Sequence, residues 1–344
     1  MRSAASLPNR PTKFGISTTV ALAALNEDAY WIARGVANLR NFQSKVNRID
    51  LGDGVTIRGR SKTDLASLGF EEPVWERITE DWRTPGASSF VLVAEHCFMK
   101  QPDNLISNEY NPSLKATRAI RALRLLAPGS IGIGPIWLTR AARFNPGIGG
   151  LSSTGTSIPM FGSSYLWSDE VQCSYPALYD ALGRLEREGY PKSPGNLEIA
   201  LRSFVSSYDR WPAFPDSKLL DLITSLEALL GIGSELAFRL SFRVAALIAP
   251  DDQQRGELLK LVRGFYDTRS RIVHGGAIEK KHRDCLQHIE GLAEIVRHLL
   301  RSFVGFAVAP VSGYGKKFWE EEFDAALLDA AKREKLRAAL KLAH

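Results

Sequence analysis

The stretch "LLDLITSLEALLG", Leu219–Gly231, decides the fold class of the carboxy-terminal half of the chain. Its leucines and isoleucine recur at spacings of three and four positions, which is the period of one helix face. Asp216 or Ser217 is suited to cap the start of this helix, and Gly231 is suited to end it. We therefore expect an amphipathic helix whose apolar face packs against neighbouring helices.

Similar apolar stripes are found on both sides of this stretch. The expected helices cover Asn196–Tyr208, a segment from Ser234 to Pro250, a segment that opens at Asp251 or Asp252, and a segment from about Lys281 through Phe303. Short loops join these segments, which favours antiparallel packing of neighbours. Residues 196–308 are thus predicted to form an all-α bundle of about five helices.

The pattern is different before the break "YPKSPG" at residues 190–195. Strands are expected at Ser88–Met99 and Ser130–Thr139, which are rich in β-branched, aromatic or alternating small and apolar residues. A helix is expected between them, over residues 111–129, and another over Asn26–Phe42. A Gly/Ser-rich loop is expected over Asn145–Ser157. Residues 1–190 are therefore predicted to be a mixed α/β domain, which makes the whole chain α+β.

The last segment, residues 316–344, reads as a separate amphipathic helix. It is acidic at its start and basic at its end, an order that suits the helix dipole. We expect these charges to stabilise the helix rather than to form a binding patch.

The composition narrows the class of protein. The chain has 344 residues, enough for about two domains, and no apolar run near the ~20 residues that cross a bilayer. The first residues, "MRSAASLPNRPTKFG", lack the apolar core of a secretory signal, so a cytoplasmic location without membrane contact is expected. Three dispersed cysteines argue against a disulfide framework. The net charge of +6 fits either an anionic partner such as nucleic acid or a merely soluble surface.

Several patterns that resemble ligand sites are incomplete. "GSIGIGPI" lacks the helix that must follow a dinucleotide-binding turn, and "GIGGLSSTGTS" lacks the lysine of a phosphate-binding loop. His282, Cys285 and His288 supply three zinc ligands without a fourth, so structural roles are expected for them. Lys115, Arg118, Arg121 and Arg124 drift by ~60° per step around a helix, which favours a solvated face over a phosphate contact.

The segment "YDTRSRIVHGG", residues 266–276, crowds cations beside a histidine at a helix end. Gly275 and Gly276 allow a C-cap that leaves His274 in the last turn. On an ideal helix Arg269 and His274 lie ~140° apart and Arg271 and His274 lie ~60° apart. Arg269 and His274 converge only if the helix deforms or if two copies face each other. A histidine can act as a general acid or base, and an arginine can stabilise a phosphorane.

A structural alternative explains the same residues without chemistry. Arg271 then pairs with Asp267 one turn earlier, and His274 caps its own helix.

The segment Arg269-Ser270-Arg271-Ile272-Val273-His274, with the glycine that follows it, resembles the motif of the HEPN superfamily. The closer likeness is to the Apea-like HEPN domains associated with bacterial anti-phage defence. Leu219–Gly231, including Glu227, looks like the upstream part of the Apea-like pattern, and Ala122–Gly132 is a weaker likeness to the amino-terminal half of such proteins. The resemblance covers roughly residues 196–308.

The resemblance implies a bundle that dimerises so that two motifs meet in a cleft. Active members are endoribonucleases that need no metal or other cofactor, and the RNA 2′-hydroxyl attacks the adjacent phosphorus to leave a 2′,3′-cyclic phosphate and a 5′-hydroxyl. Carried over, His274 is the acid/base and Arg269 the phosphate stabiliser. Ser270 is the polar neighbour, where many members carry Asn, Asp or His, and Arg271 and Glu227 are supporting residues.

Two other roles remain open at this stage. The bundle can be a non-catalytic module that binds RNA or a protein, or the motif can serve only a dimer interface. In either case the first half is expected to sense a trigger or to restrain the bundle.

Overall fold

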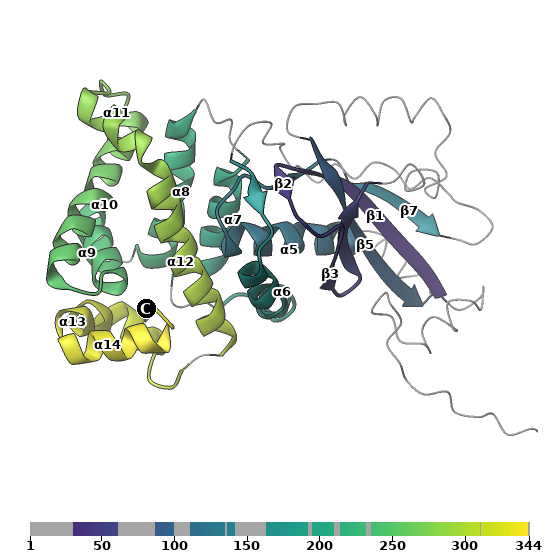
Figure 1. Cartoon of the computed structure of the whole chain (residues 1–344). Helices are drawn as coiled ribbons and strands as arrows, with labels where there is room; N and C mark the ends of the chain where they lie inside the picture. The colour runs from purple at the N-terminus through teal and green to yellow at the C-terminus, as the bar shows by residue number, and fades with distance from the viewer. Residues whose placement is uncertain are drawn as a thin grey trace, which may run out of the picture. The chain divides into compact units, whose positions relative to one another are not determined.

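The computed structural model describes residues 30–60, 87–99, 111–134, 136–141, 163–191, 195–209, 214–231, 235–309 and 311–342. They divide into two compact units, one within Met1–Arg121 and Gly129–Pro176 and the other within Ala122–Pro128 and Ala177–His344. The first unit carries the sheet and the second is helical (Figure 1), which confirms an α+β fold. The second unit includes residues 177–190 and the tail.

The sheet of the first unit is antiparallel. Its strands are β1 (Tyr30–Arg40), β3 (Arg48–Gly52), β4 (Val55–Gly59), β5 (Ala87–Met99), β6 (Gly132–Ile133) and β7 (Trp137–Ala141). They are ordered β3-β4-β5-β1-β6, and β7 also pairs with β1. Two further short strands, β2 (Phe42–Gln43) and β8 (Tyr165–Leu166), form a separate parallel pair. The expected loop at Asn145–Ser157 lies outside the described residues.

The helix expected over Asn26–Phe42 is wrong, because most of this segment is strand β1. Its alanine, leucine and arginine residues suit a helix locally, but β1 is paired with β5 along one edge and with β6 and β7 along the other. At Gly35 an added Cβ atom would lie 3.1 Å from Pro112 Cβ, so the small residue lets helix α5 approach the strand closely. Tertiary pairing therefore overrides local propensity.

The predicted helix after residue 110 is confirmed as α5 (Asn111–Leu126). The solvated face expected for its basic residues is wrong. Lys115 Nζ donates to the carbonyl oxygen of Asp53 at 2.7 Å and of Glu95 at 3.1 Å, and the Arg124 side chain is 3% exposed. Helix α6 (Asp169–Glu188), which has Pro176 in its interior, was not predicted from the sequence.

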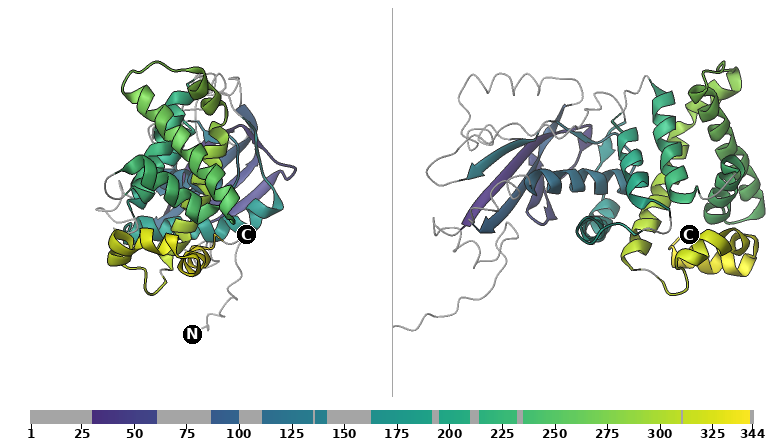
Figure 2. Two further views of the ribbon diagram at one scale, coloured as in Figure 1. Left: turned by 90° about the vertical axis from the view of Figure 1, so that its left-hand side faces the viewer. Right: turned by 180° about the vertical axis from the view of Figure 1, so that it is seen from behind.

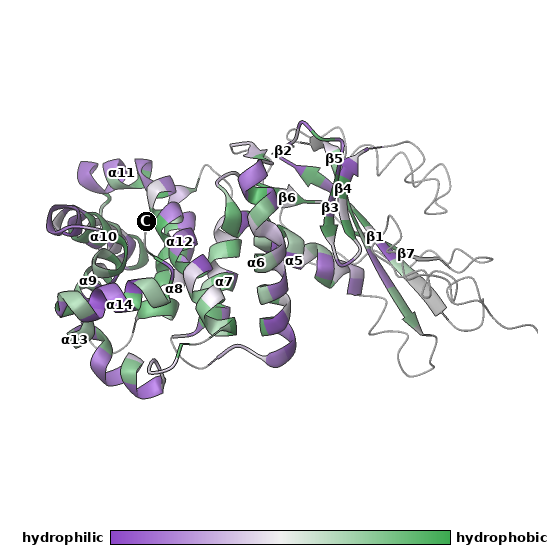
Figure 3. Ribbon diagram, turned by 60° about the horizontal axis from the view of Figure 1, so that its bottom comes forward, coloured by the Kyte–Doolittle hydropathy of each residue, from purple (hydrophilic) through white to green (hydrophobic). Residues whose placement is uncertain are grey.

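The second unit contains the predicted bundle. Its helices are α7 (Leu197–Ser207), α8 (Pro215–Leu230), α9 (Leu236–Ile248), α10 (Asp252–Val273), α11 (Lys280–Gln287) and α12 (Ile289–Val308). The apolar stripe of α8 is buried as expected, at Leu219, Leu222, Ile223, Leu226, Leu229 and Leu230. Each such side chain contributes roughly 1.5–3 kcal/mol through burial, far more than helix propensity supplies. Figure 3 shows the resulting alternation of apolar and polar helix faces.

Two helix boundaries differ from the prediction. The single helix expected from Lys281 to Phe303 is broken at His288, which ends α11 and precedes α12. Helix α8 starts one residue before Asp216, with Pro215 in its first turn, where a missing N–H costs nothing.

Buried arginines bind the carbonyl ends of several helices in the second unit. Arg124 Nη1 donates to Val205 O at 2.9 Å near the end of α7, and Arg297 Nε donates to the Arg124 carbonyl at 2.9 Å. Arg243 donates to Leu230 O, the last residue of α8. The last carbonyls of a helix have no partner within that helix. These guanidinium groups satisfy them and place positive charge at the negative end of the helix dipole.

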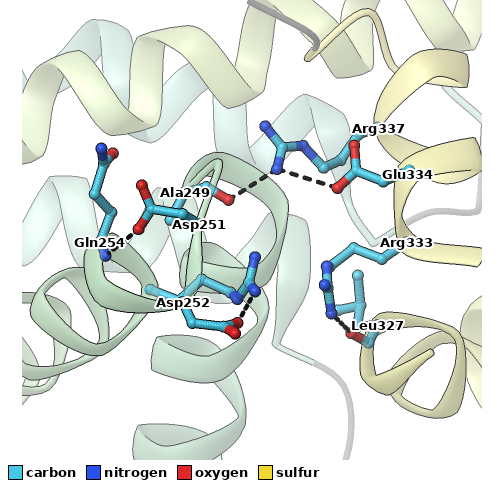
Figure 4. Close-up of polar contacts among 9 residues, drawn as sticks. Ala249, Asp251, Asp252, Gln254, Leu327, Arg333, Glu334 and Arg337 are labelled. Carbon is cyan, nitrogen blue, oxygen red and sulfur yellow. Dashed lines mark hydrogen bonds and ion pairs between the residues drawn. The ribbon is translucent and has the colours of Figure 1, made fainter. Parts of the chain in front are cut away.

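The single separate helix expected for the tail is wrong in two respects. The tail forms a π-helical turn at Phe318–Glu322, helix α13 (Phe323–Leu328) and helix α14 (Ala330–Ala339). The break falls at Asp329, where the backbone is extended. The Asp329 side chain caps α14 by accepting a hydrogen bond from Lys332 N at 3.0 Å. The tail also packs on α9: Arg337 Nη1 donates to Ala249 O at 2.8 Å (Figure 4).

A second link fixes α13 to α9. Arg243 binds Asp324 with two hydrogen bonds, Nε to Oδ1 at 2.7 Å and Nη2 to Oδ2 at 2.9 Å. The Arg243 side chain is 3% exposed, so the carboxylate compensates a buried charge and holds α13 in place.

Replacing Asp324 with alanine is expected to loosen the tail. The change removes two charge-assisted hydrogen bonds and leaves Arg243 with its contact to Leu230, which should lower the free energy of unfolding by roughly 1–3 kcal/mol. Urea denaturation measures the loss, and hydrogen exchange should show faster opening of α13 and α14. Glu322→Ala removes an exposed carboxylate from the same segment and is the matched control. Equal stability of the two variants would contradict the proposed role of Asp324.

Two glycines with positive φ offer a second stability test. Gly195 has φ +53°, and an added Cβ would lie 2.3 Å from Leu229 O; Gly189 has φ +88° with open space around it. Gly189→Ala is expected to cost only the left-handed backbone strain of about 1–2 kcal/mol. Gly195→Ala must in addition push back the end of α8, which should cost about 1–3 kcal/mol more. Thermal denaturation of both variants checks the difference.

Candidate functional site

The motif lies at the end of α10, which packs against both α8 and α9 (Figure 1 and Figure 2). Helix α10 ends at Val273, and His274 is its C-cap residue. Gly275 has φ +66° and donates to Ile272 O at 3.3 Å, while Gly276 N donates to Arg271 O at 2.8 Å. This pair of bonds is a Schellman motif, which requires a residue such as glycine at the left-handed position. It leaves the His274 side chain exposed, one position beyond the helix.

Arg269 points toward the bundle instead. Its Nη2 atom lies 3.7 Å from Glu227 Oε2 on α8, and the two side chains are 26% and 21% exposed. Its guanidinium also lies over the Tyr266 ring, 6.0 Å from the centroid. A separation of 3.7 Å is an ionic contact rather than a hydrogen bond. Arg269 Nε is buried and has no hydrogen-bond partner among the described residues.

Tyr266 joins Arg269 and Glu227 into one cluster. Burial raises the pKa of the Tyr266 hydroxyl, and the negative charge of Glu227 and a hydrogen bond to it raise the pKa further. The positive charge of Arg269 lowers it in part. Tyr266 was not predicted as a site residue, although its position three residues before Arg269 places the two on neighbouring parts of the helix surface.

The expected structural pairing of Arg271 with Asp267 is not formed among the described residues, where neither side chain has an ion-pair partner. Arg271 is exposed, and its Cδ atom would lie 3.0 Å from a Cβ added at Gly276. Its positive charge is one of several that lower the pKa of Glu279, the largest influence being a hydrogen bond from Lys281. Of the two arginines, Arg269 therefore faces α8 and Arg271 faces outward.

Ser270 contributes through its backbone. Its carbonyl accepts the hydrogen bond from His274 N at 3.0 Å, and its side chain is half-buried. The described residues form no hydrogen bond or ion pair between Arg269 and His274, in agreement with the wide angle between them on the helix. Within a single chain, Arg269, Glu227 and Tyr266 therefore form one cluster, and His274 is not part of it.

The His/Cys series on α11 has a structural environment. His282 is 3% exposed, and its Nδ1 atom accepts a hydrogen bond from Glu279 N at 3.2 Å as part of a capping box. Burial raises the pKa of the Cys285 thiol, and a hydrogen bond with Thr268 opposes this shift. Within the described ranges, no group of three or more His, Cys, Asp or Glu residues is placed to hold a metal ion.

Comparison of the chain with protein-family models, with curated proteins and with solved structures gives no match. Among the described residues, no helix has the length and apolar character needed to span a membrane.

Replacing Glu227 with glutamine tests the cluster directly. Because the change removes a negative charge beside Tyr266, the ionised form of the tyrosine becomes less unfavourable and its pKa should fall toward the ordinary value. Ultraviolet titration of the tyrosines follows this change, and Tyr266→Phe identifies which step of the titration curve belongs to this residue. Glu235→Gln, which alters an exposed carboxylate before α9, should leave the curve unchanged. If the Tyr266 step occurs at the same pH in Glu227→Gln and in the wild type, Glu227 does not influence the pKa of Tyr266 and the cluster is contradicted.

Proposed function

We propose that the second unit is an Apea-like HEPN domain that acts as a metal-independent endoribonuclease. The observation that carries the proposal is the arrangement at the end of α10. Arg269 is half-buried beside Glu227 with an unused Nε donor, and His274 is exposed immediately after the last helical residue. An arginine donor and an exposed imidazole are the two groups that cleavage of an RNA phosphodiester needs.

The chemistry follows from these two groups. A neutral His274 accepts the proton of the RNA 2′-hydroxyl as its oxygen attacks the adjacent phosphorus. A protonated imidazole donates a proton to the departing 5′-oxygen, so the products are a 2′,3′-cyclic phosphate and a 5′-hydroxyl. Arg269 stabilises the extra negative charge on the phosphorus oxygens in the transition state, where a guanidinium can bind two of them.

The proposal includes a homodimer. Arg269 faces α8 whereas His274 faces outward, so a single chain does not present both groups to one phosphate. Two chains related by a twofold axis bring two copies of His274 into a shared cleft, and one copy serves as the base while the other serves as the acid. Glu227 holds the Arg269 guanidinium by charge, which supports a positioning role for this carboxylate.

The remaining parts of the proposal concern context. The enzyme is proposed to act in the cytoplasm in anti-phage or stress defence, with RNA as its substrate. The first unit is proposed to sense the trigger or to restrain the nuclease.

RNA cleavage by purified variants tests this function. His274→Ala should lower the cleavage rate by about 10²–10⁴-fold through loss of acid/base catalysis. Arg269→Ala should lower it by about 10²–10³-fold through loss of charge stabilisation. The products should carry 2′,3′-cyclic phosphate ends, and EDTA should not change the rate.

His288→Ala is the matched control for His274→Ala. His288 is also exposed and is also the C-cap residue of its helix, α11, but it lies outside the motif. Cleavage at the wild-type rate by folded His274→Ala would overturn the catalytic assignment. So would an equal loss of cleavage in His288→Ala, since it would show that the rate responds to the helix ends in general.

A second candidate function is a non-catalytic module that binds RNA or a protein through the same surface. The ionic contact between Arg269 and Glu227 favours it, because this contact neutralises the arginine within the chain. This candidate predicts RNA binding that weakens as salt rises, without cleavage products. If the motif serves only a dimer interface, Arg269→Ala changes the oligomeric state and leaves RNA binding intact. Analytical ultracentrifugation measures the oligomeric state.

A further inference from the structure

In the tail of the second unit, a pocket joins an apolar wall to a positively charged rim. Helices α13 and α14 pack against each other (Figure 1), and both of them line the pocket together with residues 311–314 and Phe318. Its volume of about 510 Å³ lies within the range of small-molecule sites. The lining residues do not include any residue of the motif at the end of α10. The size therefore fits a small molecule at a site separate from the motif.

The apolar wall is held by an aromatic cluster. Tyr314 and Phe318 meet edge to face, with ring centroids 4.8 Å apart and ring planes at 77°. Trp319 is 2% exposed, its ring lies 5.2 Å from that of Phe318, and its Nε1 donates to Tyr314 O at 3.0 Å. Phe306 of α12 packs on Tyr314 with a centroid distance of 6.1 Å. Because these rings already hold one another, a ligand does not need to order the wall.

The backbone is unusual at the same place. Phe318 is the first residue of the π-helical turn Phe318–Glu322, and its side chain forms part of the pocket wall. Turns of this kind are rare and occur frequently at functional sites. The π-helical turn and the pocket wall thus coincide at Phe318.

Apolar surface at this pocket remains in contact with water. Val311 lines the pocket and is 44% exposed, and Tyr314 and Ala339 are half-buried. Covering this surface with the apolar part of a ligand removes it from water, which is favourable. The wall therefore supplies a driving force for an apolar body of matching size.

The charged residues that line the pocket are Lys332 and Lys335 of α14, and its lining among the described residues contains no aspartate or glutamate. Their spacing of three positions makes them neighbours on the helix surface. A hydrogen bond from Lys332 N is the main cause that lowers the pKa of Asp329, and the charge of Lys332 lowers it further. Asp329 thus balances part of the Lys332 charge, and within the described part of the chain Lys335 has no ion-pair partner. A lysine reaches an anion as a point charge on a flexible stem, so neither side chain has to be fixed.

We propose that this pocket binds a small amphipathic anion, which is an apolar body that carries a carboxylate. The apolar body packs against Tyr314 and Phe318, and the carboxylate lies at the rim, where Lys335 contacts it and Lys332 adds positive potential. A neutral apolar molecule would leave the lysines unused, and a small polyanion would leave the apolar wall in water. The inference concerns the tail alone and does not depend on the ribonuclease activity.

Isothermal titration of the full chain with 2-naphthoate at fixed ionic strength tests the site. The wild type should bind one equivalent with a saturable curve. The uncharged 2-naphthamide has the same apolar body and should bind about twofold to fivefold more weakly, which is the effect of losing one exposed ion pair.

Lys335→Gln removes the proposed contact with the carboxylate. It should weaken 2-naphthoate binding about twofold to fivefold and leave 2-naphthamide binding unchanged, because only the anion meets the lysine. Lys317→Gln is the matched control, since Lys317 is also an exposed lysine of the tail but does not line the pocket. This control should bind both compounds as the wild type does.

Ala339→Phe is a second variant that leaves both lysines in place. Ala339 lines the pocket from α14, so a phenyl ring there should fill the volume that holds the ligand and weaken binding of both compounds about tenfold or more. Circular dichroism and thermal denaturation establish that the variant is folded, and Lys335→Gln decides the matter if it is not.

Three results would overturn the proposal. One is that the wild type does not bind 2-naphthoate saturably, or that it binds only vesicles of anionic phospholipid. Another is that Lys335→Gln binds 2-naphthoate no more weakly than Lys317→Gln. The third is that folded Ala339→Phe binds both compounds as tightly as the wild type.

Discussion

Capping of helix carbonyl ends by buried arginines is the constraint on which the second unit depends. The last carbonyls of a helix have no partner within that helix, and burying them without hydrogen bonds is costly. Arg124 satisfies the end of α7, Arg243 the end of α8, Arg337 the end of α9, and Arg297 a carbonyl near the end of α5. Each of these arginines is about 3% exposed. Helices can therefore end inside the packed unit rather than at its surface.

Because some arginines are buried at helix ends, the net positive charge of the chain does not by itself indicate an anionic partner. A net charge of +6 suggests an anionic partner when every arginine is taken to lie on the surface. In this protein part of the positive charge is buried and serves helix ends, as with Arg297, which also contacts Tyr208 and Glu294. Burial raises the pKa of Tyr208 even though the charge of Arg297 opposes the shift. Functional arginines must therefore be identified by position, and charge counts alone do not find them.

Local information was enough for the bundle and insufficient for several other features. The stripe of α8 needs only a period of three to four residues, so it could be predicted from the sequence. Strand β1 depends on partners far along the chain, and its own sequence mixes residues that favour a helix with residues that favour a strand. The breaks at His288 and Asp329 depend on how each segment packs. Within the candidate site, the sequence motif was enough to single out Arg269 and His274 as candidates. The contact of Arg269 with Glu227 could not be predicted, because it depends on which face of α10 packs against α8.

Arg269 differs from the capping arginines in its polar contacts. Arg124, Arg243 and Arg297 also point into the helical unit, and each donates to a helix carbonyl. Arg269 has no such acceptor among the described residues, and its one ionic partner, on α8, lies beyond hydrogen-bonding distance. The Arg269 side chain is 26% exposed, so its guanidinium has already lost part of its hydration and its exposed part can contact a phosphate. This partly exposed guanidinium supports the proposed contact of Arg269 with a phosphate.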